Sequence, residues 1–237
     1  MWKIIFREID VVSLLVKQSN GFNSDLKTRV VLIETEEKWR SSPADGVKRL
    51  FLDRTDFSEY TSATTIVKFA KNSRFSKHSH QNGEEFFVLE GIFSDEYGDY
   101  PKGTYVRNPH GTRHSPYSKE GCKIFVKLRQ FQKEDNKRIV KSMFEPWKKY
   151  NTKVNYLHLH NFKNEIAYLV KFEPHSAVDL PFRSNGGEEI LILSGGIRDR
   201  KKNFTAITWI RDPKRCLVEA YAGANGACVF VKTGHLF

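Results

Sequence analysis

Short runs of β-branched and aromatic residues follow one another along this chain, separated by turn-forming residues. The runs are Leu50–Leu52, Thr64–Phe69, Glu85–Leu89, Thr104–Val106, Lys123–Lys127, Ile166–Val170, Ile190–Leu193, Thr205–Trp209 and Ala227–Val231. Gly, Pro, Asn, Asp and Ser separate these runs at intervals of about ten to twenty residues, a spacing typical of β-sandwiches and β-barrels. Neither half of the chain shows a long stretch with the apolar periodicity of a helix. The pattern therefore predicts an all-β protein.

The pattern is present twice, because short motifs recur at an offset of 103 to 105 residues. The recurring pairs are Val67-Lys-Phe69 with Val170-Lys-Phe172, Gly83-Glu-Glu with Gly187-Glu-Glu, Asp95 with Asp199, Arg107-x-Pro109 with Arg211-x-Pro213, and Phe125-Val-Lys127 with Phe230-Val-Lys232. A constant offset indicates two copies of one unit rather than two unrelated domains. We expect the copies at residues 37–130 and 154–237, a linker with one short helix at 131–153, and an N-terminal extension at 1–36 in which Val30–Ile33 supplies an extra strand.

One segment of the first copy, from His78 to Glu84, has the composition of a metal site. His78 and His80 share a face if the segment is a strand, because alternate side chains of a strand point the same way. A tight turn at Asn82-Gly83 would return the chain so that Glu84 faces the same cavity. His114 follows a further turn that leaves a strand. Three imidazoles and one carboxylate that converge inside a barrel make a site suited to Zn, Fe, Mn, Ni or Cu.

The residues around these four are similar to the two-part signature of the cupin superfamily, whose members are small jelly-roll barrels. In the first part, Asn72, His78, His80, Glu84 and Gly91 stand at the intervals of the signature, with Asn72 in place of a glycine. In the second part, Gly103, Pro109, Gly111 and His114 stand at its intervals, with Ser118 in place of an asparagine. Both departures lie outside the four ligand positions, and asparagine tolerates the left-handed conformation better than most residues. The resemblance implies two tandem cupin domains, that is, a bicupin of two jelly-roll β-barrels.

A closer resemblance covers most of residues 39–130 and is to the ChrR-type cupin-like domain. The residues that carry it are Trp39, Gly46-Val47, His78, His80, Gly83–Gly91, Asp95, Tyr100–Gly103, Arg107, Pro109 and Gly121–Lys127. That family includes the C-terminal domain of zinc-binding anti-sigma factors and related small-molecule dioxygenases. The resemblance implies that His78, His80, Glu84 and His114 bind one divalent transition metal per chain, with Zn favoured and Fe, Mn or Ni as alternatives.

The resemblance leaves two functions open. The first is a small-molecule or stress-sensing regulatory module, which would act without the sigma-binding zinc domain because the chain has no CxxC pair. The alternative is a metal-dependent dioxygenase acting on a small diketone-like or hydroxyketone-like substrate, with Glu84 as a candidate general base. Both functions place a small-molecule ligand or substrate in the N-terminal barrel, and both allow a homodimer.

The second copy departs from the ligand pattern. Phe182, Ser184 and Val218 stand at the three histidine positions, and only Glu188 is retained. One carboxylate does not hold a transition metal, so we expect a degenerate site. The second barrel is then a scaffold, an interface or a metal-free pocket.

Several residues near the motif have an ordinary structural interpretation. His158 and His160 form a second His-x-His pair without a carboxylate at the motif's interval, and we expect both to face outward from a strand. His110 is expected in an exposed turn. Phe86 and Val88 share a strand face with Glu84, and core packing is favoured over a role in a pocket. The polar candidates for a pocket are Tyr105, Arg107 and Tyr117.

Composition changes this picture little. Lys and Arg outnumber Asp and Glu by 39 to 28, which gives a formal net charge of +11. This excess is spread along the chain, whereas nucleic-acid modules concentrate it on one helix or stripe, so nucleic-acid binding is disfavoured. The cysteines form no CxxC pair, which disfavours a disulfide framework and a cysteine zinc site, and we expect Cys122 and Cys228 to be buried. The sequence has no signal peptide and no apolar stretch of membrane-spanning length, which predicts a cytoplasmic protein without a membrane partner.

Overall fold

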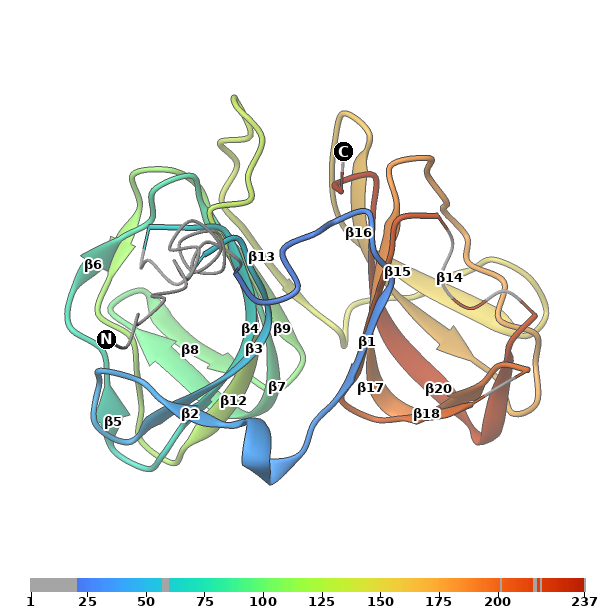
Figure 1. Ribbon diagram of the computed structural model, residues 1–237, viewed down its shortest axis with the longest axis horizontal. Helices are drawn as coiled ribbons and strands as arrows, with labels where there is room; N and C mark the ends of the chain where they lie inside the picture. The colour runs from blue at the N-terminus through green and yellow to red at the C-terminus, as the bar shows by residue number, and fades with distance from the viewer. Residues whose placement is uncertain (1–20, 57–59, 201, 215–216, 218, 237) are drawn as a thin grey trace, which may run out of the picture.

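The computed structural model describes residues 21–56, 60–200, 202–214, 217 and 219–236. The chain forms two β-barrels that lie side by side (Figure 1), here called the first and the second barrel. Within the described residues the only helical element is one 3-10 turn, η1 (Glu36–Lys38). The predicted all-β fold of two tandem barrels is confirmed. Nothing helical in this part of the chain is long and apolar enough to cross a membrane.

The first barrel consists of a ten-stranded sheet and a two-stranded sheet. Its strands are β2 (Arg40–Ser41), β3 (Val47–Arg54), β4 (Ala63–Phe69), β5 (Ser73–Arg74), β6 (His78–Ser79), β7 (Glu84–Asp95), β8 (Gly98–Pro101), β9 (Thr104–Asn108), β10 (Arg113–His114), β11 (Tyr117–Ser118), β12 (Cys122–Leu128) and β13 (Ile139–Ser142). The larger sheet runs in the order β13-β9-β7-β12-β4-β3-β2, and β6 pairs with β10. Two candidate ligands lie on β6 and β10, and a third begins β7.

The second barrel is built on the same plan. Its strands are β1 (Val30–Ile33), β14 (Lys148–Lys149), β15 (Val154–Phe162), β16 (Glu165–Phe172), β17 (Glu188–Arg198), β18 (Asn203–Thr205), β19 (Thr208–Asp212) and β20 (Tyr221–Thr233). The order is β1-β19-β17-β20-β16-β15-β14, with β18 paired to β17. Strands β19, β17 and β20 therefore hold the places that β9, β7 and β12 hold in the first barrel, as the repeated motifs predict.

The two barrels exchange the strands that precede them in the chain. β1 comes before the first barrel in the sequence but pairs with β19 of the second, where Val30 lies opposite Arg211. β13 comes before the second barrel but pairs with β9 of the first, where Ile139 lies opposite Arg107. The segment 131–153, expected to be a linker with a short helix, contains β13 and β14 and no helix. The sheet edge of the first barrel supplies the hydrogen-bond partners that hold β13 extended.

One predicted strand of the second barrel is divided in two. The run Thr205–Trp209 forms the end of β18 and the start of β19, with a turn at which Ile207 has a φ of 61°. The equivalent residue of the first barrel is Gly103, with a φ of 87°. Glycine enters this region freely, whereas a β-branched residue enters it only when its surroundings hold it there. The turn was not predicted because the second copy lacks the glycine that would have signalled it.

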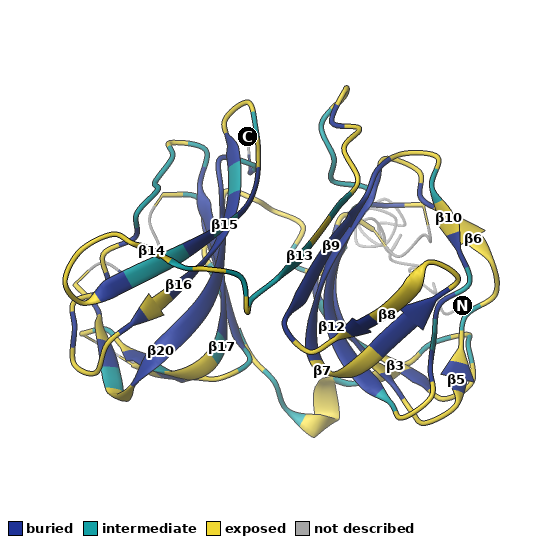
Figure 2. Cartoon of the chain, turned by 180° about the vertical axis from the view of Figure 1, so that it is seen from behind, coloured by how far each residue is buried: buried dark blue, intermediate teal, exposed yellow. Residues whose placement is uncertain are grey.

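A shared apolar cluster joins the two barrels in addition to the core inside each. Its buried members are Leu50, Leu52, Ile66, Phe87, Leu89, Tyr105 and Phe125 of the first barrel and Leu157, Leu159, Ala167, Leu169, Leu191, Trp209 and Phe230 of the second. Figure 2 shows the corresponding buried strands facing one another between the barrels. Because successive side chains of a strand point to opposite faces, one face of these strands fills its own barrel and the other packs against the neighbouring barrel.

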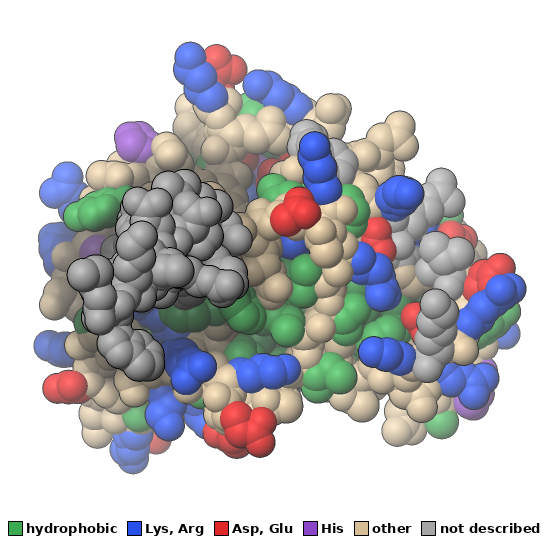
Figure 3. Space-filling view, viewed as in Figure 1, with side chains coloured by type: hydrophobic (Ala, Val, Ile, Leu, Met, Phe, Trp, Pro, Cys, Tyr) green, Lys and Arg blue, Asp and Glu red, His purple; other side chains and the backbone are tan. Residues whose placement is uncertain are grey.

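The surface charge is distributed over both barrels. Figure 3 shows Lys and Arg side chains scattered across both halves of the face that it presents, with acidic side chains between them. This face carries no single basic stripe of the kind that tracks a nucleic-acid backbone.

Candidate metal centre

A turn at Gln81 and Asn82 brings three of the candidate ligands together. Asn82 and Gly83 have φ values of 54° and 78°, in the left-handed region that asparagine tolerates and glycine enters freely. This turn leads from the segment that holds His78 and His80 into β7, whose first residue is Glu84. The chain therefore turns one residue earlier than predicted, and Glu84 still begins the next strand.

The fourth ligand comes from a strand that pairs with the first. β10 lies antiparallel to β6, so that His114 is directly opposite His78. The pairing continues beyond β6, because the amide of Gly111 donates to the carbonyl of His80 at 3.0 Å. Asn72, which stands in place of a signature glycine, has a φ of 61° and lies in the left-handed region that asparagine tolerates.

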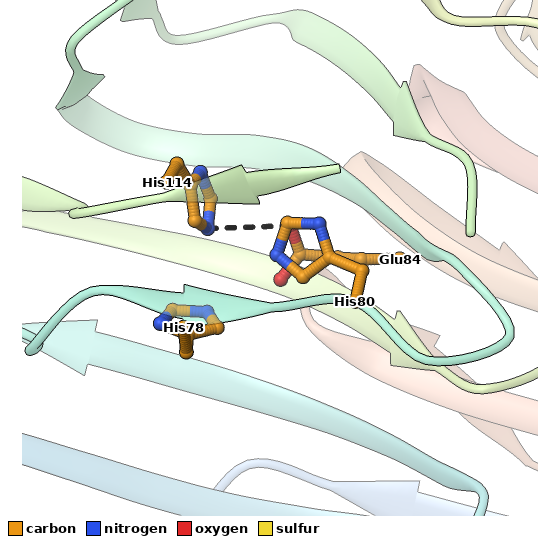
Figure 4. A group of neighbouring side chains, drawn as sticks. All are labelled: His78, His80, Glu84 and His114. Carbon is orange, nitrogen blue, oxygen red and sulfur yellow. Dashed lines mark ion pairs between the residues drawn. The ribbon is translucent and has the colours of Figure 1, made fainter. Parts of the chain in front are cut away.

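The four side chains face a common centre (Figure 4). Their ligand atoms all lie within 4.8 Å of one another. Nε2 of His80 is 3.3 Å from Oε2 of Glu84, and Nε2 of His114 is 3.6 Å from the same oxygen. Metal–ligand bonds of about 2.1 Å place opposite ligand atoms about 4.2 Å apart, so the cluster has nearly the size of a coordination shell. His80, Glu84 and His114 are buried, whereas His78 is exposed at the edge of the group.

The two buried histidines are each oriented by a neighbouring oxygen. Nδ1 of His80 lies 2.9 Å from the hydroxyl of Thr112, and Nδ1 of His114 lies 3.0 Å from Oδ2 of Asp95. Their Nε2 atoms are buried and have no hydrogen-bond partner among the described residues. A buried polar nitrogen without a partner is costly unless a ligand satisfies it. The donor set and its two unpartnered nitrogens therefore fit a metal ion.

The other two ligands are also held from outside the cluster. Oε2 of Glu84 accepts a hydrogen bond from the side-chain amide of Asn108 at 3.1 Å. Nδ1 of His78 lies 2.9 Å from the carbonyl of Ser76, which leaves its Nε2 for the centre. The sequence assigned no role to Asn108. Its position in the Arg107-x-Pro109 motif, opposite Glu84 in the β7–β9 register, is the only signal that could have indicated one.

The pKa values of Glu84 and His80 favour the forms that bind metal, whereas that of His114 favours the protonated imidazole. Burial raises the pKa of Glu84, but the imidazoles of His80 and His114 outweigh it and hold this pKa below its usual value. Burial lowers the pKa of His80. Burial also acts to lower the pKa of His114, but the hydrogen bond to Asp95 and the negative charges of Glu84 and Asp95 together outweigh it, and the pKa is raised. The lowered pKa makes Glu84 a weak base, so the role of ligand suits it better than the role of general base.

Replacing Asp95 with Asn should weaken metal binding by about 10–100-fold, because an amide removes the negative charge that orients His114. Isothermal titration of the metal-free protein with Zn²⁺ measures the change. Asp99→Asn is the matched control, since Asp99 lies in the same β7–β8 hairpin and accepts from Ser94 without touching a ligand. Equal affinities of the Asp95 variant and the control would contradict an orienting role for Asp95.

A cavity of about 790 Å³ opens beside the ligands inside the first barrel, and His78, His80 and Glu84 form part of its lining. Its volume lies within the range of about 300–1,000 Å³ that is typical of small-molecule sites. The apolar part of the lining includes Val67, Phe69, Phe75, Ile124 and Val126. The cationic part includes Arg49, Arg54, Arg74, Lys77 and Arg129, against Asp45 and Glu84 as the acidic residues. This lining suits a small molecule with an apolar body and negative charge.

The equivalent region of the second barrel is filled by protein groups. Phe182 packs edge-on against two tyrosine rings, at centroid distances of 5.1 and 5.2 Å. Glu188, the retained carboxylate, pairs with Arg183, whose Nη1 lies 2.6 Å from Oε1. Ser184 accepts a backbone amide at 3.2 Å, and Val218 lies outside the described residues. The guanidinium of Arg183 thus supplies the positive charge beside Glu188. In the first barrel a metal ion would supply the positive charge beside the equivalent carboxylate, Glu84.

Two of the polar pocket candidates face the second barrel instead of the cavity. The hydroxyl of Tyr105 donates to Oε2 of Glu85 at 2.8 Å, and Nη1 of Arg107 lies 2.5 Å from the same oxygen. Neither residue lines the cavity, and neither does Tyr117 on β11. The side chains alternate along β9, and the sequence alone does not reveal which face of this strand meets the second barrel.

The remaining residues near the motif have structural positions. Phe86 and Val88 are buried in the apolar core of the first barrel. His110 is exposed, and its Nδ1 accepts the amide of Asn82 at 3.2 Å. Cys122 and Cys228 are free and buried, and burial raises the pKa of both thiols to about 11.

The second His-x-His pair does not face solvent as expected. His158 is half-buried, whereas His160 is buried and its Nε2 lies 3.0 Å from Oδ2 of Asp135. The prediction that both histidines face outward was wrong for His160. A β-bulge between the two residues shifts the register with β16 and turns His160 toward the first barrel.

His160, Asp135 and Glu165 lie close enough together to hold a metal ion, but protein cations already occupy this group. Arg107 pairs with both carboxylates, and the ammonium of Lys232 lies 2.9 Å from Oε1 of Glu165. An additional cation would meet these positive charges at contact distance. We therefore assign the group to the interface between the barrels rather than to a second metal site.

Comparison with protein families gives one match, which occurs twice. The family model described as the ChrR cupin-like domain matches residues 27–132 and again residues 135–237. The first match contains all four candidate ligands, and together the matches span both barrels. No curated protein matches the chain.

Solved proteins of low sequence identity share the fold. A protein of Nostoc punctiforme described as a candidate dioxygenase has a TM-score of 0.67 at 16% identity, over 86% of this chain and 82% of that chain. Ylba from Escherichia coli has a TM-score of 0.63 at 15% identity, over 94% and 96% of the chains. The bacterial pirin YhhW from Escherichia coli, solved in complex with nickel(II), has a TM-score of 0.60 at 12% identity, over 86% and 98%. At these identities the likeness shows the fold alone.

Proposed function

Because the chain belongs to the ChrR cupin-like domain family, we propose that its first barrel binds one divalent transition metal and presents it to a small organic molecule in the adjoining cavity. The proposed ligands are His78, His80, Glu84 and His114. The observation that carries the proposal is the pair of buried Nε2 atoms of His80 and His114, which face Glu84 without a hydrogen-bond partner among the described residues.

Three imidazole nitrogens and one carboxylate oxygen suit Zn, Fe, Mn or Ni. Because the four residues supply four donors and three of them line the cavity, a bound metal with a higher coordination number would leave room for a substrate oxygen from the cavity. The same four donors accommodate each of these metals. The identity of the metal is therefore the first quantity to measure.

We propose that the reaction is the oxidative cleavage of a small diketone-like or hydroxyketone-like molecule by O2. A bound metal supplies Lewis-acid polarisation of the substrate oxygen. A diketone ionises to an enolate, and the cationic side chains of the lining, Arg49, Arg54 and Arg129 among them, complement that charge. Cleavage of one carbon–carbon bond with both oxygen atoms of O2 entering the products balances without an external reductant.

The family match supports a second function, that of a small-molecule or stress-sensing regulatory module. In this function the same four residues hold the metal tightly, and a molecule in the cavity alters the contacts of the protein with a partner. These 237 residues contain no CxxC pair, so the proposal concerns the cupin-like module alone.

Metal analysis combined with an oxygen electrode separates the two functions. A dioxygenase should contain about one Fe, Mn or Ni per chain and consume one O2 for each diketone lost, and His114→Ala should abolish the uptake. A sensor should contain tightly held Zn and consume no O2 with any of a panel of diketones and hydroxyketones. Purified protein that takes up none of these four metals would contradict both functions.

A further inference from the structure

Six of the charged side chains that are buried where the two barrels meet form two equivalent sets. Three belong to each barrel and occupy equivalent positions: Glu85, Arg107 and Lys127 in the first, and Glu189, Arg211 and Lys232 in the second. None of the six is more than 2% exposed. Buried charges persist only when each is paired with an opposite charge or hydrogen-bonded. The pairing of these residues is therefore informative.

The lysines and glutamates of these two sets are paired across the barrels, and Nζ of Lys232 also lies 2.9 Å from Oε1 of Glu165 in its own barrel. In the sheet registers Lys127 lies opposite Glu85, and Lys232 lies opposite Glu189. The ion pairs do not follow the registers. Nζ of Lys127 lies 2.5 Å from Oε2 of Glu189, and Nζ of Lys232 pairs with Oε1 of Glu85. Each barrel thus anchors the glutamate of the other.

Glu85 is held from both sides. Oε2 accepts from Tyr105 and Arg107 of its own barrel, and Oε1 accepts from Lys232 of the second barrel. Burial raises the pKa of Glu85, but Lys232 and Arg107 outweigh it, so the pKa lies well below its usual value. Lys232 is the contact through which the second barrel fixes this carboxylate.

Glu85 is also the immediate neighbour of a proposed metal ligand. Glu84 and Glu85 point to opposite faces of β7, one into the first barrel and the other to the interface. The next strand repeats the arrangement, because Asn108 lies opposite Glu84 and Arg107 lies opposite Glu85. Asn108 donates to Glu84, and Arg107 pairs with Glu85. The same two strands therefore hold the metal site on one face and the interface network on the other.

We propose that Lys232 is a positioning residue for the metal centre of the first barrel. Lys232 fixes the side chain of Glu85, and the backbone of β7 transmits this constraint to the neighbouring Glu84. The second barrel, which has a degenerate site, thereby contributes to the metal site of the first barrel. The inference rests on the proposed function in one respect, that Glu84 is a metal ligand. The exchanged pair between Lys127 and Glu189 has no such role, because Glu188 next to Glu189 is neutralised by Arg183.

The test compares Lys232→Met with Glu189→Gln. Both substitutions lie in the second barrel, and each breaks one of the two exchanged pairs. The probe is Co²⁺, whose visible absorption reports ligand geometry and whose titration gives an affinity. Lys232→Met should weaken Co²⁺ binding by about tenfold and alter the visible spectrum. Glu189→Gln should leave both within about twofold of wild type, although both variants lose stability to urea.

A second variant covers the case in which Lys232→Met does not fold. The double variant Glu85→Gln with Lys232→Met removes both charges of the pair and should fold more readily. It should show the same weakened Co²⁺ binding. Wild-type affinity in whichever variant folds, or equal losses in the Lys232 and Glu189 variants, would overturn the positioning role. Failure of the wild-type protein to bind Co²⁺ would instead refute the proposed metal site itself.

Discussion

Replacing His80 with alanine should lower the bound metal from about one ion per chain to near zero. His80 supplies a buried nitrogen that faces Glu84, and its other nitrogen is held by Thr112. Loss of a ligand costs more than loss of an outer hydrogen-bond partner, for which about 10–100-fold in affinity is typical. Elemental analysis of the purified variant measures the effect.

His110→Ala is the matched control for this variant. His110 is an exposed histidine of the neighbouring turn, and its Nδ1 accepts the amide of Asn82. Its removal should leave the metal content unchanged. Added metal should also raise the Tm of wild type and of the control but not that of the His80 variant, because a ligand that binds the folded state stabilises it. Metal content near one ion per chain in His80→Ala would show that the ligand set is wrong.

Replacing Arg107 with methionine should lower the free energy of unfolding by about 3–5 kcal/mol. Arg107 is fully buried and pairs with Glu85, Asp135 and Glu165. Removal of the guanidinium leaves these carboxylates buried with fewer opposite charges. Since a domain has only about 5–15 kcal/mol of net stability, this loss is a large part of the whole. Urea unfolding followed by circular dichroism measures it.

Arg138→Met is the control for the Arg107 variant. Arg138 is exposed and donates to the hydroxyl of Tyr100 at 3.0 Å. Surface substitutions of this kind change stability by about 0.5 kcal/mol or less. If the two variants lost equal stability, the buried charges would not be coupled in the way that the distances indicate.

The grouping of the four candidate ligands was largely predictable because its information is local. His78, His80 and Glu84 lie within seven residues on either side of one turn, and Asn82 and Gly83 adopt the positive φ values that let the chain enter β7. The fourth ligand comes from the strand that pairs with the first, and its spacing fits a known signature. Ligands that sit near the turns of a small barrel therefore leave a recognisable pattern in the sequence.

The interface network could not be predicted from the sequence, because its partners are far apart along the chain. Glu85 and Lys232 are separated by 147 positions in the chain, and Lys127 and Glu189 by 62. Charged residues at alternate positions of a strand normally indicate the face that is exposed to solvent. Only the packing of one barrel against the other buries them. The same packing, together with a β-bulge, reversed the expected exposure of His160.

The exchange of β1 and β13 makes the chain the covalent counterpart of a two-fold dimer in which single barrels trade their N-terminal arms. Gene duplication from such an ancestor would join both arms in one polypeptide, so that association no longer depends on protein concentration. One half could then lose its histidines without loss of the assembly. The surface through which a single barrel would dimerise is buried between the two barrels of this chain. Any homodimer of the whole protein must therefore be built on a different face.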